Sequence, residues 1–318
     1  MSGKKRRRPE YRPPQQQAAE TKRPQTPPAT EEGGRRPAGI LGFLNRGAPV
    51  SSPYPPIRRS IGRAFVAVCS QPVLLGTIFL LVFVVREGLL VLGFPPRTGF
   101  FAATLALPPV SAVLDADIAR TIFGESTGII MTPVLLLVRT LIVAMLTGMV
   151  AESVEHGRVT LRGIGAGLRG SPGLLGAAII GLGAVFIGSL VVSFTGLGLL
   201  GVVGILAVVL FFLGYAPIVA VRYRKGLTWT VRKAVRAGRI PGSQNAVLAT
   251  IYSVLALLVI VALVPAGSDF DANPAITTWI GILLANVIHV VMLGVYVHRF
   301  LWAEGDIPDP PEPAPRRR

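Results

Sequence analysis

Long stretches of almost purely apolar residues constrain this chain more than any other feature. Several of them reach the roughly 20 residues that a helix needs to cross a hydrocarbon core about 30 Å thick. Backbone amides in lipid must be paired within their own segment, and no barrel-like alternation occurs, so helices are the expected form. Hydrophobic residues make up 51% of the chain and charged residues only 15%, which is too apolar for an ordinary soluble domain. The sequence therefore predicts an integral membrane protein.

Six of these stretches are predicted to be transmembrane helices. The expected fold is an all-α, polytopic membrane helical bundle in residues 56–302, with consecutive spans paired as three hairpins. Residues 1–55 and 303–318 are expected to be disordered cytoplasmic tails, because they lack the apolar content that offsets the entropy of ordering. The expected spans are residues 73–94, 130–150, 173–192, 197–219, 246–266 and 277–300.

The orientation follows from basic residues in short connections, which stay on the cytoplasmic side. The connection before the fifth span is strongly basic, whereas the one before the sixth carries Asp269 and Asp271 without a base. We therefore expect a plasma-membrane protein with both termini in the cytoplasm. The net charge of +16 lies mainly in tails and connections, so we expect contact with the bilayer and its anionic headgroups, and no nucleic-acid binding.

The outer segment 97–128 is not simply polar, since residues 100–107 are apolar and residues 110–123 carry apolar side chains at helical spacing. Pro108 and Pro109 argue against one continuous span through it. Two interpretations stay open here, a re-entrant piece and an interfacial one.

An internal similarity suggests repeated units. Residues 70–79 return as residues 243–252 with Ser, Gln, Leu, Thr and Ile in register, and a weaker copy precedes the third span. Chance similarity among leucine-rich helices is the alternative. Each copy is interpreted as an amphipathic cytoplasmic helix, a break and a span, with basic side chains that can reach lipid phosphates. The lipid-headgroup candidates are the arginines of these helices, namely Arg59, Arg63, Arg158, Arg162, Arg232 and Arg236.

Charged and polar residues within the spans are candidates for function, because they are costly in lipid. Glu87 and Arg139 lie at a similar expected depth, which predicts an ion pair between them. Arg86 is then left to snorkel outward or to contact outer acids such as Asp115 or Asp117. Asn286 and His289 are three residues apart and share one helix face. We interpret them as an interhelical hydrogen-bonding pair, or alternatively as a solute or proton site.

No catalytic constellation is present in the sequence. Glu152, Glu155 and His156 suggest metal ligands, but no His-Glu-x-x-His pattern or second cluster completes a site, so neither a metal nor a cofactor is expected. Glycines and alanines at spacings of three and four in the third and fourth spans indicate close helix packing. These small residues are Ala177, Gly181, Ala184, Gly188, Gly198, Gly201 and Gly204.

The layout resembles a broad superfamily of six-span proteins that includes the membrane domain of glycerophosphodiester phosphodiesterases. The resemblance rests on the six arginines above and on residues 70–79 and 243–252. It implies helical hairpins preceded by basic amphipathic segments. In that family the hydrolase is a separate soluble domain that these residues do not supply, so the resemblance implies no enzymatic activity.

Two classes of function remain. The first is a non-enzymatic membrane module, a scaffold or accessory that interacts with lipid or with a protein partner. The second is a transporter or channel for a solute, favoured by the intramembrane charges. The units run parallel, so the inverted symmetry common among secondary transporters is missing. The sequence therefore favours the first class.

Overall fold

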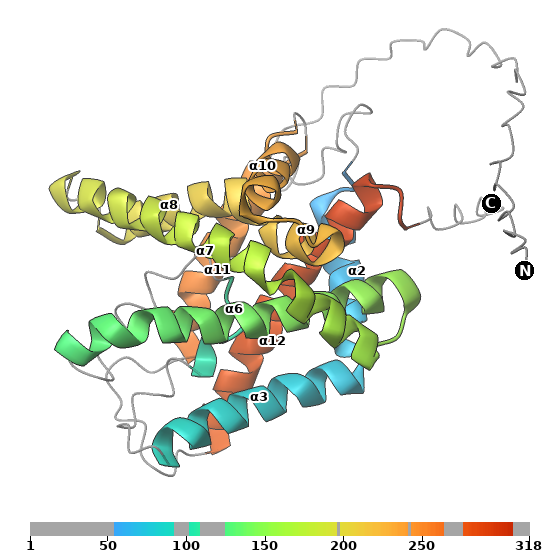
Figure 1. The fold of residues 1–318 in the computed structure, drawn as a ribbon, viewed down its shortest axis with the longest axis horizontal. Helices are drawn as coiled ribbons and strands as arrows, with labels where there is room; N and C mark the ends of the chain where they lie inside the picture. Colours follow the sequence, from blue (N-terminus) through green and yellow to red (C-terminus); the bar gives the residue numbers. More distant parts are fainter. Residues whose placement is uncertain are drawn as a thin grey trace, which may run out of the picture.

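The computed structural model of the protein describes residues 54–91, 102–108, 125–195, 198–240, 243–263 and 276–307. These residues form α-helices and include no strand (Figure 1). The predicted all-α class is confirmed for them. Most of both predicted tails and most of segment 97–128 lie outside the described residues. The helices are α2 (Ile57–Cys69), α3 (Pro72–Val91), α6 (Glu125–His156), α7 (Leu161–Thr195), α8 (Gly198–Leu213), α9 (Ala216–Tyr223), α10 (Leu227–Gly238), α11 (Asn245–Leu263) and α12 (Ile276–Ala303).

Several helices are long and apolar enough to cross a membrane. Within the described residues there are four, or five if α2 and α3, bent by 76° at their junction, count as one broken span. Helix α11 contributes only a shorter apolar stretch, Asn245–Val259. The count of six spans is therefore not confirmed and stays a prediction. The four spans are Ile130–His156, Leu161–Val192, Val203–Tyr223 and Trp279–Ala303.

Large apolar side chains cover outward faces of the bundle. On α3, Phe79, Leu80 and Phe83 are exposed, and Phe186 and Ile187 are exposed on α7. Monomeric soluble proteins rarely expose apolar patches of this kind, because they promote aggregation in water. Lipid tails solvate such faces, so the surface agrees with a membrane-embedded protein.

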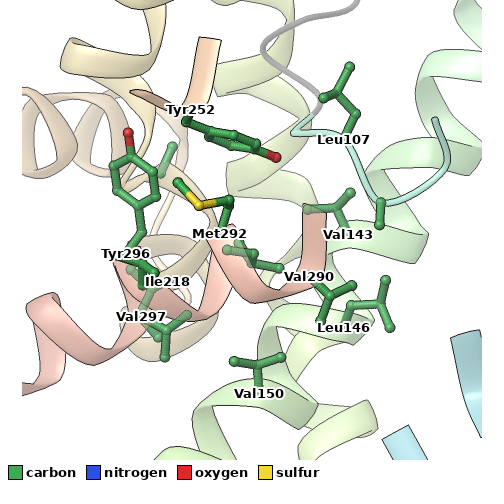
Figure 2. Packing of buried hydrophobic residues seen from close by; sticks show 14 of the residues in the cluster. Leu107, Val143, Leu146, Val150, Ile218, Tyr252, Val290, Met292, Tyr296 and Val297 are labelled. Carbon is green, nitrogen blue, oxygen red and sulfur yellow. The ribbon is translucent and has the colours of Figure 1, made fainter. Parts of the chain in front are cut away.

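Helix α12 lies at the centre of the bundle. It contacts α2, α3, α6, α9 and α11, and Figure 1 shows it crossing between α3 and α6. From His289 onward almost every residue of α12 is buried. Figure 2 shows Val290 and Met292 of this helix among core side chains of α6 and α11 such as Val143 and Tyr252. The other elements are thus arranged around one buried helix.

The helices pair differently from the three predicted hairpins. Helix α6 packs most extensively on α7, α8 on α11, and α12 on α2. Helices α7 with α8 and α11 with α12 do touch, but α3 has little contact with α6. The predicted pairing of the first two spans is therefore not confirmed, because both α3 and α6 pack more extensively on α12 than on each other (Figure 1).

The two clearest sequence copies share an order of elements but not a geometry. Helix α2 continues to Cys69 and α3 begins at Pro72, whereas α10 ends at Gly238 and α11 begins at Asn245. Pro241 and Gly242 stand where the first copy has Val68 and Cys69, and neither favours helix continuation. Within the later break, Gln244 is left-handed, with φ of 58°. The internal repeat is therefore not shown, and the predicted match between the two breaks is wrong.

The third copy contains no break at all. Helix α7 runs from Leu161 to Thr195 through Pro172. Proline lacks the N–H that would bond the carbonyl of Leu168 four residues earlier. The Ser171 hydroxyl donates to that same carbonyl at 2.8 Å and replaces the missing donor. The predicted break before the third span is wrong, because the Ser171 hydroxyl satisfies the carbonyl that Pro172 leaves unpaired and the helix continues.

Glycines allow the end of α6 and the start of α7 to approach closely. A side-chain carbon at Gly148 would overlap the carbonyl oxygen of Gly163, and one at Gly167 would overlap that of Ala144. The clashing atoms are backbone, so a side chain could not turn away to make room. The predicted small-residue contact between α7 and α8 exists at Gly188, against Ile205, but α6 and α7 approach each other more closely.

This crossing predicts a sharp difference between two neighbouring glycines of α7. Replacing Gly167 with alanine should lower the free energy of unfolding by about 1–3 kcal/mol, because backbone atoms must separate. Replacing Gly165 with alanine, whose Cβ would meet no neighbouring atom within 4 Å, should leave stability equal or raise it by up to about 1 kcal/mol, since alanine favours helix. Thermal unfolding in detergent measures both. Equal effects of the two substitutions would contradict the crossing.

Candidate functional site

Polar side chains from two helices hold residues 102–108 inside the bundle. Every residue of this segment is buried, and Figure 2 shows Leu107 beside Val143 and Tyr252. An interfacial piece would leave one side exposed to solvent or headgroups. The burial of these residues therefore favours the re-entrant interpretation for this part of segment 97–128.

Asn286 of α12 binds the backbone of this segment at two points. Its Oδ1 accepts a hydrogen bond from the Ala106 amide at 2.9 Å, and its Nδ2 donates to the Ala102 carbonyl at 2.8 Å. Asn286 lies about 10 Å along the helix from Trp279, where water is not at hand to satisfy an irregular backbone. One side-chain amide thus replaces the partners that regular secondary structure would supply.

Arg139 of α6 binds the same segment from another helix. It is fully buried. Its Nη1 donates to the Thr104 carbonyl at 2.6 Å, and its Nη2 donates to the Thr104 hydroxyl at 3.2 Å. Together, Arg139 and Asn286 hold this backbone at three residues, Ala102, Thr104 and Ala106.

The predicted ion pair between Glu87 and Arg139 is wrong. Glu87 pairs with the adjacent Arg86, whose guanidinium also lies 4.7 Å from the ring centre of Trp279. The reason is packing, because α3 lies on α12 and hardly touches α6. Arg86 is buried, whereas 36% of the Glu87 side chain is exposed. The predicted outer partners of Arg86, Asp115 and Asp117, lie outside the described residues.

His289 lies one helical turn beyond Asn286 and is fully buried. Its Nδ1 is 3.4 Å from the Tyr252 hydroxyl. Among the described residues, its Nε2 has no hydrogen-bond partner, and the same holds for the hydroxyl of Tyr296. Asn286 and His289 thus share a face of α12 but have different environments.

A third buried cation, Arg299 near the end of α12, joins segments that are far apart in the sequence. Its Nη1 donates to the Pro55 carbonyl at 2.5 Å, and its Nη2 donates to the Ser243 carbonyl and, at 3.3 Å, to Asn245 Oδ1. Its Nε lies 3.4 Å from the Tyr215 hydroxyl. In the described ranges no carboxylate pairs with Arg299, so neutral oxygens surround the charge.

Two tyrosines and an asparagine complete this network. The Tyr54 and Tyr215 rings stack at 5.6 Å, and the Arg299 guanidinium lies 5.1 Å from the Tyr54 ring centre. Tyr215 donates to Asn245 Oδ1 at 2.6 Å, and Asn245 donates to the carbonyls of Ala237 and Gly238. Burial, with Tyr215 nearby, raises the pKa of Tyr54 far above its usual value, so its hydroxyl stays a neutral donor to Ala237. Tyr54 and Pro55, placed in the predicted tail, are therefore packed residues.

The sequence interpretation missed Arg299, because the predicted orientation alone accounts for an arginine at this end of the sixth span. A signal was present in Asn245, which occupies the position of Pro72 in the aligned copies. A polar residue at the first position of an apolar helix needs a partner when it is buried.

The predicted headgroup arginines all lie at the surface. Arg59 and Arg63 are exposed on α2, and the guanidinium of Arg59 lies 4.6 Å from the ring centre of Trp302. Arg232 and Arg236 are exposed on α10. Arg158 and Arg162 are exposed at the connection between α6 and α7.

The residues that suggested a metal have other partners. Glu152 accepts hydrogen bonds from the amide and hydroxyl of Thr160 at 2.8 and 2.6 Å and from the Gly163 amide at 3.1 Å. Glu155 lies 3.3 Å from Arg222 and 3.8 Å from His156. Glu152 therefore caps the start of α7. The described residues contain no group of three or more His, Cys, Asp or Glu side chains that could hold a metal ion.

The first residues after α12 are also held in place. Lys233 Nζ is 2.8 Å from Glu304, which accepts a hydrogen bond from Tyr223. Burial alone would raise the pKa of Glu304, but the hydrogen bonds from Lys233 and Tyr223 outweigh it and lower that pKa below its usual value. The predicted tail from residue 303 thus begins with ordered contacts.

No protein-family model, curated protein or solved structure matches the chain. The resemblance to the phosphodiesterase membrane domain stays a prediction.

The stability of the fold should depend on the several N–H donors of the Arg299 guanidinium as well as on its charge. Replacing Arg299 with lysine should lower the free energy of unfolding by about 2–3 kcal/mol, since one ammonium cannot serve Pro55, Ser243 and Asn245 together. Arg232→Lys on exposed α10 is the control and should change stability by less than about 0.5 kcal/mol. Thermal unfolding in detergent measures both, and a neutral Arg299→Lys would contradict the network.

Asn286 should keep residues 102–108 in the core. In a Cys69→Ser background, a cysteine introduced at Ala103 should react slowly with a soluble thiol reagent, because the position is buried. Adding Asn286→Ala should speed the reaction, since the amide of Ala106 and the carbonyl of Ala102 lose their partner. Adding Leu284→Ala, on the exposed side of the same helix, should not. Equal rates in all three proteins would count against the anchoring role.

Proposed function

We propose that the chain is a non-enzymatic integral membrane module that interacts with lipid or with a protein partner at its cytoplasmic face. In this proposal the host is the plasma membrane and both termini are cytoplasmic, as the charges of the connections favour. One observation carries the proposal. Deep polar side chains that could serve a solute instead bind the chain's own backbone.

The partners of these side chains support a structural role. Arg139 donates to Thr104, Asn286 bridges Ala102 and Ala106, and Arg299 donates to carbonyls of two connecting segments. A transport site near the middle of the bilayer needs groups that can exchange partners with a solute. Here such an exchange would leave buried backbone groups unpaired.

The cytoplasmic face supplies the groups that meet lipid. Helices α2 and α10 each bury a narrow face and leave arginines exposed. A basic amphipathic helix of this kind suits the layer of lipid headgroups, with Trp229 of α10 as a further interfacial side chain.

A transporter or channel is the second candidate, and one specific observation favours it. His289 Nε2 and the Tyr296 hydroxyl are buried without a hydrogen-bond partner among the described residues. Buried polar groups usually find partners, so a solute or proton could supply one here.

Ligand-dependent thermal unfolding separates the two classes. We expect phosphatidylglycerol in mixed micelles to raise the unfolding midpoint, and a panel of soluble ions and small metabolites to leave it unchanged. His289→Gln tests the alternative, with Thr250→Val on the exposed side of α11 as its control. A soluble compound that stabilises the wild type and the control, but not His289→Gln, would overturn the module and favour transport.

A further inference from the structure

A cavity of about 690 Å³ opens where α6 ends, α7 begins and α9 ends. These are the arginine-rich ends of three candidate spans, so the cavity lies at the level of the headgroups if those spans cross the membrane. Its charged lining comes from four arginines and two glutamates, with His156 at the end of α6.

The arginines and the carboxylates of this cavity are in different states. Glu152 already accepts hydrogen bonds from Thr160 and Gly163, and Glu155 already forms an ion pair with Arg222. In contrast, the guanidiniums of three lining arginines have no hydrogen bond or ion pair with any described residue. These three are Arg158, Arg162 and Arg224. The cavity therefore has an excess of uncommitted positive charge.

The rest of the wall is small or apolar. Gly148, Ala151 and Ala166 leave room between the helices. Leu161, the first residue of α7, lines the cavity and is 83% exposed. An exposed leucine beside free guanidiniums suits a ligand with an anionic head and an apolar body.

We propose that this cavity binds a phosphate-bearing anion, whose source is the headgroup of an anionic phospholipid in the cytoplasmic leaflet. Guanidinium groups bind phosphate oxygens through paired, charge-assisted hydrogen bonds. Basic pockets between transmembrane helices on the cytoplasmic side have this chemistry for lipid headgroups. The inference deepens the proposed function and rests on it, because it names the lipid class that the module meets. A soluble phosphate compound has the same chemistry, and the experiment distinguishes it.

The test compares two triple variants with the same loss of charge. The cavity variant is Arg158→Gln, Arg162→Gln and Arg224→Gln. The control is Arg169→Gln, Lys225→Gln and Arg239→Gln, which removes three exposed basic side chains that neither line the cavity nor belong to the six headgroup arginines. Each protein in neutral detergent is titrated with short-chain phosphatidylglycerol, with phosphatidylcholine and with inorganic phosphate, and bound lipid is counted by native mass spectrometry.

We expect phosphatidylglycerol to bind the wild type and the control with similar affinity and the cavity variant about tenfold or more weakly. Equal weakening in both triple variants would show non-specific attraction to a basic surface and overturn the site. No binding to the wild type would also overturn it. Inorganic phosphate binding as tightly as the lipid would assign the cavity to a soluble compound and reject the lipid source.

A second variant keeps all charges, in case the triple substitution impairs folding. Ala166→Phe fills the cavity from its wall and should weaken phosphatidylglycerol binding to a similar extent. Unchanged lipid binding by a folded Ala166→Phe protein would reject the cavity as the binding place. That result would leave the proposed module intact, since the lipid-induced rise of the unfolding midpoint does not depend on which arginines bind.

Discussion

A backbone N–H or C=O in the hydrocarbon region has no water to bond, and the rest of this structure depends on how that constraint is met. Helices meet it internally for most of the chain. Residues 102–108 and the connections near Pro55 and Ser243 cannot, because they carry no long helix. Asn286, Arg139 and Arg299 supply the missing partners from α6 and α12. The central helix is thus both the apolar core and the main source of polar side chains for irregular backbone.

A buried guanidinium without a carboxylate is unusual, since desolvation of a charge costs several kcal/mol. Arg299 spreads its charge over two carbonyls, an asparagine oxygen and a tyrosine hydroxyl, with the face of Tyr54 alongside. Each of these oxygens would also be costly if left unpaired. Cation and acceptors therefore offset one another, and the network links the N-terminal end of the bundle to its last helix.

The sequence predicts the class of this fold well, because apolar stretches of span length leave little choice but helix. It predicts chain breaks less well. Pro172 looks like a break before the third span, but Ser171 lies next to it and donates to the carbonyl that proline leaves unpaired. Pro241 and Gly242, in contrast, shorten α10 although the surrounding residues match the first copy. Whether a proline ends a helix depends on whether a nearby side chain can donate to the carbonyl that the proline leaves unpaired. An alignment of the sequence copies does not show this.

Partners of the polar residues are the part that sequence cannot supply. Depth along two neighbouring spans gave Glu87 and Arg139 as a pair, but depth says nothing of which helices touch, and α12 lies between theirs. Asn286 was identified as a polar residue that needs a partner, yet its partner is backbone, which has no sequence signature. Arg299 resembles any arginine that marks the inner end of a span.

The arginines of this chain divide by what surrounds them. Those inside the bundle are bound to oxygens of the chain itself, so they are committed to holding the fold. Those that line the cavity between α6, α7 and α9 lie beside carboxylates that already have other partners, so their donors remain for a ligand. The close crossing of α6 and α7 at Gly148 and Gly163 sets the position of both helix ends that form this cavity. Packing inside the membrane therefore determines where the free positive charge gathers outside it.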